Sequence, residues 1–305
     1  MKKEIVNIPA SIHQKLLNLA RSTNRSFNDL LYIYANERFL YRLSISIYQS
    51  IFVLKGAMAV LNLAFEHPRY TRDIDLLGFT DNSIQNIEDV IREICGIDFE
   101  DDGLIFDPKS VRGMPIKESD EYSGVRVNYY AYLGSMKTPN LQIDIGVGDV
   151  VFPQVKEVVY GGLLDLPGAS IRVYPPEAIL SEKIHTLEKY GLLNSRMKDI
   201  YDIWHIASNQ KIDGVTMRES LRLTFENRQT SIPELLIIFE EDYINKRRIT
   251  AWKSLGKKLM SDEDIPELTL VINQLKIFLI SLLASLHQGK EFSLEWDPSK
   301  DWAWQ

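Results

Sequence analysis

The stretch from His67 to Leu77, HPRYTRDIDLL, combines the pattern of a buried β-strand with two carboxylates. Side chains two positions apart in a strand point to the same face, so Asp73 and Asp75 share one face while Ile74 and Leu76 share the other. Two like charges held side by side repel, and neither is buried cheaply without a partner. The pair therefore predicts a neighbouring cation, for which a divalent metal is the obvious candidate.

Two further segments strengthen this interpretation, because an Asp-x-Asp pair alone is a weak motif. Asp144, in the alternating segment LQIDIG, supplies a third carboxylate on a strand face. Asp73, Asp75 and Asp144 on neighbouring strands would form an oxygen cage for Mg²⁺ or Mn²⁺. The turn Lys55-Gly56-Ala57 follows an apolar run and opens an expected helix, so its backbone N–H groups suit the phosphates of a nucleotide.

Charged residues also interrupt the apolar stripes of two expected helices. Lys183 falls on such a stripe, which predicts either a snorkelling side chain or a lysine that reaches a triphosphate. Asp199 and Asp202 share a face of the next helix, where a charge near the helix start can simply offset the helix dipole. Arg72, beside the acidic pair, either neutralises the carboxylates or holds a phosphate.

The composition is that of a globular protein with more than one packed unit. The 305 residues are 45% hydrophobic, and a formal net charge of -7 argues against a surface coated in basic charge, although a local basic patch is compatible with it. Cys95 is the only cysteine, which excludes an intramolecular disulfide. The start lacks the apolar segment of a secretory signal, and the most apolar run, residues 275–286, is expected to be too short to cross a bilayer. We therefore expect a cytoplasmic protein without a membrane partner.

Three regions of the chain differ in the pattern of their apolar and turn-forming residues. Residues 1–48 predict two helices, the second capped by Ser26. Residues 49–174 contain short apolar or alternating runs separated by Gly, Pro, Asp and Asn, which indicates a small mixed sheet with flanking helices. Residues 175–305 predict a helical C-terminal domain, with a helix start at Pro175-Pro176 and further helices at 196–208, 214–226, 232–260 and 265–287. The expected fold class is α+β.

The chain resembles a known family in the order of five segments, namely LKGAMAVL, RYTRDIDLL, LQIDIGVGD, EAILSEKIHTL and SRMKDIYDIWHIA. Spread over residues 26–210, they are similar to motifs of the AbiEii/AbiGii toxin family in the DNA polymerase β-like nucleotidyltransferase superfamily. The resemblance implies a metal-dependent toxin nucleotidyltransferase of a bacterial toxin–antitoxin, abortive-infection or antiviral defence system. A nucleoside triphosphate would donate a nucleotide to the 3′ end of tRNA, and a cognate antitoxin would oppose the toxin without a stable complex.

The resemblance also implies roles for the matched residues. The first motif contains Gly56 and Ala57, the metal-binding second motif Asp73 and Asp75, the third Lys183, and the fourth Asp199 together with Asp202. The expected catalytic residues are Asp73, Asp75, Lys183 and Asp199, and the expected nucleotide-binding residues are Gly56, Ala57, Arg72, Lys183 and Asp202. The helical C-terminal domain is expected to complete the active-site cleft. Where relatives have Gly-Gly or Gly-Ser, this chain has Gly56-Ala57, which removes a serine hydroxyl from the phosphate site.

An RNA acceptor requires a basic surface, and the best candidate lies in NKRRITAWKSLGKKL. Its basic residues comprise Lys246, Lys253 and Lys257 on one helix face, with Arg247, Arg248 and Lys258 nearby. A solvated helix face gives the same pattern, so the sequence leaves both interpretations open.

Three other functions fit parts of the pattern. A nucleotidyltransferase that modifies a small molecule or a protein suits the acidic balance of the chain. A non-catalytic module that binds a nucleotide is compatible with the change at Ala57. A metal-dependent nuclease explains the carboxylates but gives no purpose to Lys183 or the glycine turn.

Overall fold

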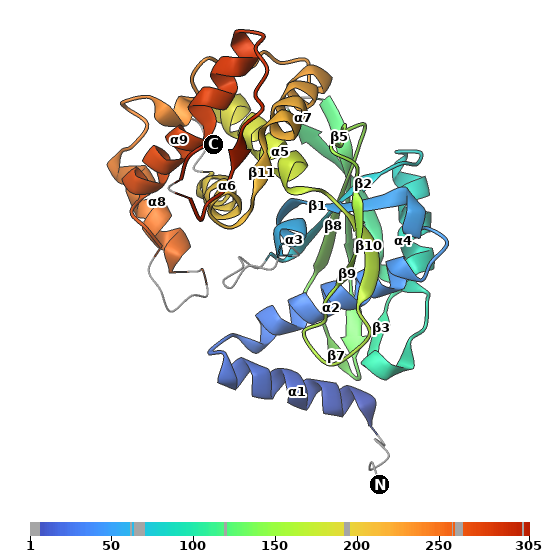
Figure 1. Cartoon of the computed structure of the whole chain (residues 1–305). Helices are drawn as coiled ribbons and strands as arrows, with labels where there is room; N and C mark the ends of the chain where they lie inside the picture. The colour runs from blue at the N-terminus through green and yellow to red at the C-terminus, as the bar shows by residue number, and fades with distance from the viewer. Residues whose placement is uncertain are drawn as a thin grey trace. The chain divides into compact units, whose positions relative to one another are not determined.

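The computed structural model describes residues 7–61, 63, 71–118, 121–191, 196–257, 259, 265–300 and 302–305. His67 to Tyr70 of the opening stretch therefore lie outside the described residues, as does Lys258. The chain divides into two compact units (Figure 1). The sheet unit comprises Met1–Met58, Tyr70–Gly148 and Lys156–Val173, and the helical unit comprises Ala59–Arg69, Asp149–Val155 and Tyr174–Gln305.

A seven-stranded mixed sheet forms the centre of the sheet unit and confirms the expected fold class. Its strand order is β4-β5-β8-β2-β1-β10-β9, in which β2 with β8 and β1 with β10 are the parallel pairs. Its strands are β1 Phe52–Lys55, β2 Asp73–Gly78, β4 Arg112–Glu118, β5 Glu121–Tyr129, β8 Leu141–Val147, β9 Lys156–Tyr160 and β10 Ala169–Val173. A smaller sheet contains β3 Leu104–Phe106, β6 Ala131–Leu133 and β7 Met136–Lys137.

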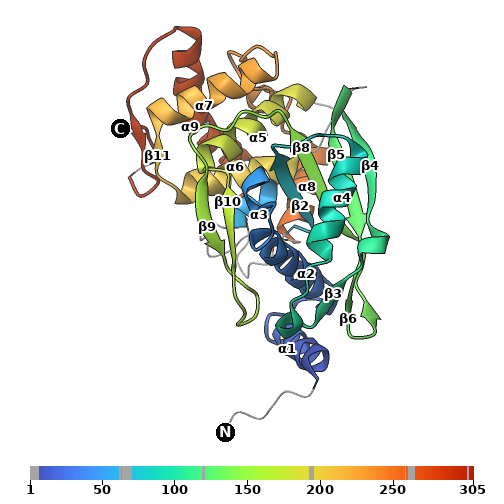
Figure 2. The same cartoon turned by 90° about the vertical axis from the view of Figure 1, so that its right-hand side faces the viewer.

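The two faces of the central sheet differ in chemistry, as the alternation in the opening stretch predicts. Ile74 and Ile143 on one face are fully buried, whereas Asp75 and Asp144 on the other are half-buried. Helices α2 Phe27–Ser44 and α4 Ile84–Cys95 pack beside each other on the sheet (Figure 2). Phe39 of α2 contacts the buried ring of Tyr129 on β5, with 5.3 Å between the ring centroids. The apolar face is thus covered by helices, and the carboxylates lie on the opposite face.

The N-terminal helices form as expected. Helix α1 spans Ile8–Ser22, and the hydroxyl of Ser26 accepts a hydrogen bond from Asp29 N at 3.1 Å to cap α2. Arg42 of α2 forms a buried ion pair with Asp102, with 2.6 Å between Nη1 and Oδ2. Cys95 at the end of α4 is buried, and its burial raises the pKa of the thiol.

The helical unit is built from α5 to α9, which pack as a cluster (Figure 1). Its helices are α5 Pro176–Tyr190, α6 Met197–Asn209, α7 Gly214–Asn227, α8 Lys246–Gly256 and α9 Leu268–His287, with a two-stranded sheet of β11 Ile212–Asp213 and β12 Glu295–Trp296. The other helical elements of the described chain are short. They are α3 Gly56–Leu61 and the 3-10 turns Gln49–Ile51, Glu100–Asp102, Pro108–Ser110 and Ile237–Phe239.

One helix prediction was wrong in its first half. The sequence predicts a helix over 232–260, but α8 begins only at Lys246, where the side chain of Asn245 accepts a hydrogen bond from Arg248 N at 3.1 Å. Before it, Leu236 and Ile238 are buried in a segment that contains the 3-10 turn Ile237–Phe239 and otherwise irregular backbone. A short apolar run does not distinguish a helix from a buried extended segment, because both are apolar without a period.

Helix α9 also corrects the expectation from the apolar run. It has 20 residues and a mean hydropathy of 1.8 in its most apolar window, so by length and composition it could cross a membrane. Half of that window is buried inside the protein. A core helix passes the same test, so α9 is weak evidence for a membrane span.

Candidate active site

Four charged residues form a row across the polar face of the central sheet. In the strand register, Asp75 lies opposite Lys55 on one side and opposite Asp144 on the other, and Asp144 lies opposite Arg126. Side chains directly opposite in adjacent strands share a face and interact. Asp73 lies two residues before Asp75 on the same face. The row thus places two carboxylates between two cations and adds a third carboxylate beside them.

Arg126 and Asp144 form the best-defined contact of this row. Arg126 Nε donates to Asp144 Oδ1 at 2.9 Å, and Arg126 Nη2 donates to Asp144 Oδ2 at 2.7 Å. Gln142 Nε2 also donates to Asp144 Oδ1, at 3.1 Å. The hydrogen bond and the charge of Asp144 raise the pKa of Arg126, and the charges of Asp73 and Asp75 add to this effect. Arg126 therefore lies in the field of all three carboxylates.

Gly56 is required where the chain turns from β1 into α3. Its φ of +64° is a left-handed conformation that side chains rarely adopt, and an added β-carbon would overlap the carboxylate of Asp75. The absence of a side chain at position 56 therefore lets the carboxylate of Asp75 approach the backbone of the first motif. Ala57, the next residue, is buried with 8% of its surface exposed.

The carboxylates of β2 fit a divalent metal as a pair. Mg²⁺ is usually held by one or two carboxylates together with water and substrate phosphates, and Asp73 with Asp75 provides such a pair on one strand face. Within the described part of the chain, no three His, Cys, Asp or Glu side chains are gathered closely enough to hold a metal ion. Arg126 donates to both oxygens of Asp144, so the third carboxylate of the expected cage is paired with a cation in this structure. The assignment of Asp144 to the metal stays a prediction.

Arg72 has a partner other than the acidic pair. Its Nη2 lies 2.8 Å from Oδ1 of Asp29 on α2, and 66% of its side chain is exposed. Its guanidinium carbon also lies 5.4 Å from the centre of the Tyr32 ring. The structure thus pairs Arg72 with the start of α2, and its predicted contact with a nucleotide remains a prediction.

The predicted charged residues of the helical unit contact one another. Lys183 Nζ of α5 lies 3.1 Å from Asp199 Oδ1 and 2.7 Å from Asp202 Oδ2, both on α6. Arg196 lies 3.3 Å from the other oxygen of Asp199. The Lys183 side chain is 11% exposed and that of Asp202 only 2%. The sequence motifs that contain these residues therefore meet in a nearly buried ion-pair cluster that joins two helices.

Sequence reasoning missed three charged partners, which are Lys55, Arg126 and Arg196. Arg126 stands between Val125 and Val127, both fully buried, so its side chain points to the polar face. That alternation was the available signal. Its pairing with Asp144 depends on the register of β5 against β8, which a single sequence does not contain.

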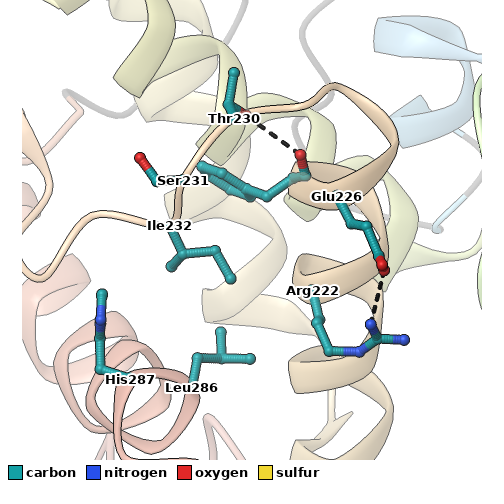
Figure 3. Close-up of a pocket in the computed structure, with 8 residues that line it drawn as sticks. Arg222, Glu226, Thr230, Ser231, Ile232, Leu286 and His287 are labelled. Atoms are coloured by element: carbon teal, nitrogen blue, oxygen red, sulfur yellow. Dashed lines mark hydrogen bonds and ion pairs between the residues drawn. The ribbon is translucent and has the colours of Figure 1, made fainter.

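A cavity of about 500 Å³ in the helical unit is unrelated to these residues. It is lined by Arg222, Phe225, Glu226, Thr230, Ser231, Ile232, Leu286 and His287. Figure 3 shows Arg222 directed toward Glu226, with which it forms an ion pair at 2.7 Å. None of the predicted site residues lines this cavity, so it is not the candidate active site.

The fold is that of nucleotidyltransferases. The structure resembles MenT4, a nucleotidyltransferase toxin from Mycobacterium tuberculosis H37Rv, with a TM-score of 0.51 at 15% identity over 91% of this chain and 98% of that one. It also resembles JHP933 from Helicobacter pylori, with a TM-score of 0.45 at 15% identity over 83% of this chain and 89% of that one. No curated protein matches the sequence significantly.

The sequence itself identifies the family. A family model described as the nucleotidyl transferase AbiEii toxin of type IV toxin–antitoxin systems matches residues 38–274. The chain therefore belongs to the AbiEii nucleotidyltransferase toxin family, as the order of its motifs predicted.

Proposed function

We propose that this protein is a metal-dependent toxin that transfers a nucleotide from a nucleoside triphosphate to the 3′ end of tRNA. The observation that carries the proposal is the pair of carboxylates, Asp73 and Asp75, on the polar face of β2 beside the Gly56 turn. Membership in a nucleotidyltransferase toxin family supports the reaction class.

In this proposal, Asp73 and Asp75 hold a divalent ion, and the backbone at Gly56 and Ala57 receives the triphosphate. The bound ion would neutralise phosphate charge and lower the pKa of the acceptor hydroxyl. That hydroxyl would lose its proton to solvent and attack the α-phosphorus, the bond to the pyrophosphate would break, and the nucleotide would remain on the acceptor. The roles of Lys183, Asp199 and Asp202 in binding and charge neutralisation rest on their motif positions. That of Arg72 rests on its place beside the acidic pair.

Incubation with each labelled nucleoside triphosphate, total tRNA and Mg²⁺ tests the proposal. We expect label on tRNA with the wild type and none with Asp73→Asn, while the far-ultraviolet circular dichroism of the two proteins agrees. Label on protein or on a small molecule would identify a different acceptor. Shortened RNA would indicate a nuclease, and nucleotide binding without any transfer would indicate a binding module.

The exposed face of α8 is the proposed RNA-binding surface. Lys246, Arg247, Lys253 and Lys257 are exposed there, whereas Arg248 is buried and donates to the carbonyl of Tyr243 at 2.8 Å. Replacing Lys246, Lys253 and Lys257 with Gln should weaken tRNA binding and flatten its salt dependence, because each lysine that contacts a phosphate contributes to the slope. Arg248 is not part of this surface.

The surroundings of α8 favour a second candidate function, transfer to a small molecule or a protein. The exposed residues Glu240, Glu241 and Asp242 precede α8, and Glu267 lies 4.0 Å from Lys253. Together with the net charge of -7, these carboxylates oppose a polyanionic acceptor. The two candidates are separated by the position of the label in the same assay.

The family also implies a cognate antitoxin. We propose that this antitoxin opposes the toxin without forming a stable complex with it. Co-expression followed by size-exclusion chromatography tests this point, because rescue of growth without co-elution is the expected outcome.

A further inference from the structure

The contact between Arg126 and Asp144 bears on how many carboxylates the sheet offers to a metal ion. Three N–H donors, two from Arg126 and one from Gln142, converge on the carboxylate of Asp144 at 2.7–3.1 Å. Both oxygens of Asp144 accept from the planar fork of one guanidinium, which is the strongest kind of side-chain pairing to a carboxylate. A metal ion that used Asp144 would have to compete with this fork.

The strand pairing keeps Arg126 in this position. Val125 and Val127 on β5 are fully buried, and so are Ile143 and Ile145, which lie opposite them on β8. Moving β5 by one residue would expose these side chains and turn Arg126 to the other face. The backbone therefore holds the guanidinium opposite Asp144, and the pair does not depend on a flexible loop.

Of the three carboxylates, Asp144 interacts most strongly with Arg126. The pKa of Arg126 is raised above its ordinary value by Asp144, and with smaller contributions by Asp73 and Asp75. A guanidinium stays charged at any physiological pH, so it remains a permanent competitor for Asp144.

We propose that Arg126 is a positioning residue that withholds Asp144 from the divalent ion, so that Asp144 is not a metal ligand in the resting site. The inference rests on the proposed metal-dependent function and concerns which residues form the metal site. A site with two carboxylates binds a divalent ion more weakly than one with three, because affinity rises with the number of charged ligands. Weak binding without nucleotide makes the triphosphate itself a necessary ligand.

The test is a double-mutant cycle on Mn²⁺ affinity, measured without nucleotide by the electron paramagnetic resonance signal of free Mn²⁺. In the wild-type background, Arg126→Gln should tighten Mn²⁺ binding on the order of 10-fold, because Asp144 becomes available as a third ligand. In the Asp144→Asn background, the same substitution should change the affinity less than about 3-fold. Asp144→Asn alone should leave the affinity within about 2-fold of the wild type, whereas Asp73→Asn should weaken it strongly.

The cycle separates ligation from a simple effect of charge. If Arg126→Gln tightens binding equally in both backgrounds, the guanidinium acts only through space and the proposal is overturned. It is also overturned if Asp144→Asn alone weakens binding as much as Asp73→Asn, or if neither the wild type nor Arg126→Gln binds Mn²⁺. Arg126→Lys, which keeps the charge without the fork, provides a second variant and should give an intermediate gain.

Transfer activity is measured separately, so that this inference and the proposed function can fail independently. Nucleotide transfer without the predicted cycle would overturn the role of Arg126 alone. The predicted cycle in a protein that transfers nothing would support the role of Arg126 and contradict the proposed reaction.

Discussion

Two clusters of charged residues contain all the carboxylates singled out by the sequence, and they differ in the exposure of their carboxylates. On the sheet, Asp73, Asp75 and Asp144 accompany Lys55 and Arg126, and the paired side chains of Arg126 and Asp144 are 41% and 20% exposed. In the helical unit, Lys183 and Arg196 balance Asp199 and Asp202.

The difference shows what each cluster is suited to do. The sheet cluster gathers three carboxylates on one face and is partly open to solvent, so it is suited to a further positive charge. In the helical cluster, Lys183, Asp199 and Asp202 are largely buried, so their ion pairs also join α5 to α6. We therefore expect substitutions on the sheet to affect activity, and substitutions in the helical cluster to affect stability as well.

The largest expected effect is on the sheet. Asp75→Asn should lower nucleotide transfer by at least about 10³-fold, because it removes a charged ligand on which the chemical step depends. Its melting temperature should match that of the wild type or exceed it, since one of three neighbouring like charges is lost. Asp98→Asn, at an exposed position on the surface, is the control and should change neither quantity. A large drop in the melting temperature of Asp75→Asn would contradict the view that this carboxylate serves activity rather than stability.

The second effect concerns the helical cluster. Lys183→Met keeps the apolar stem but removes the cation that Asp199 and Asp202 share, and breaking a buried ion pair costs about 3–5 kcal/mol. The free energy of unfolding from urea titration measures this cost. Lys253→Met is the matched control, because its side chain is 62% exposed and should contribute less than about 1 kcal/mol. Equal losses for the two variants would contradict a structural role for the cluster.

The third effect separates backbone strain from overlap with a carboxylate. Gly56→Ala should lower transfer about 100-fold, because its β-carbon displaces the carboxylate of Asp75. Gly148→Ala is the control, since Gly148 has a φ of +80° with nothing within 4 Å of the added carbon. Both variants should lose about 1 kcal/mol of stability through strain, but only Gly56→Ala should lose activity. Full activity of Gly56→Ala would show that the position of Asp75 is not critical.

The smallest expected effect is the pH dependence of stability that the buried carboxyl group of Glu37 causes. Glu37 on α2 is buried, which raises its pKa from 4.5 to about 7, although it accepts a hydrogen bond from Leu163 N at 2.6 Å. Between pH 4.5 and 7 the folded protein binds more protons at this residue than the unfolded chain, so stability falls as the pH rises, by roughly 1–3 kcal/mol in total. Glu37→Gln should remove this decline when unfolding is measured at pH 5 and pH 8. An unchanged decline would assign it to other groups.

The local parts of the architecture were predictable from the sequence. The alternation around Asp73 and Asp75 depends on neighbours in the chain, so it fixed their common face before any partner was known. The caps at Ser26 and Pro175 are local signals for the same reason. Residues 232–245 were predicted incorrectly, because their apolar run has no period that distinguishes a helix from a buried irregular segment.

The partners in the site were less predictable, because they depend on strand register and helix packing. Asp144 was recognised as a third carboxylate, but Arg126 is 18 residues away in sequence and meets it only through the antiparallel pairing of β5 and β8. Lys183 was recognised as unusual on its apolar stripe, and its contacts with α6 could not be read from that stripe alone. Long-range pairing is thus the information that one sequence does not provide.

The single buried thiol has a practical consequence for the measurements proposed above. Cys95 is 4% exposed, and burial disfavours its reactive thiolate form. A cysteine introduced at an exposed position, such as Ile47 in the loop after α2, would therefore react with a maleimide or nitroxide reagent in preference to Cys95. The natural sequence can thus be labelled at an introduced cysteine with little reaction at Cys95. The distance from such a spin label to bound Mn²⁺ would help to locate the ion without a crystal.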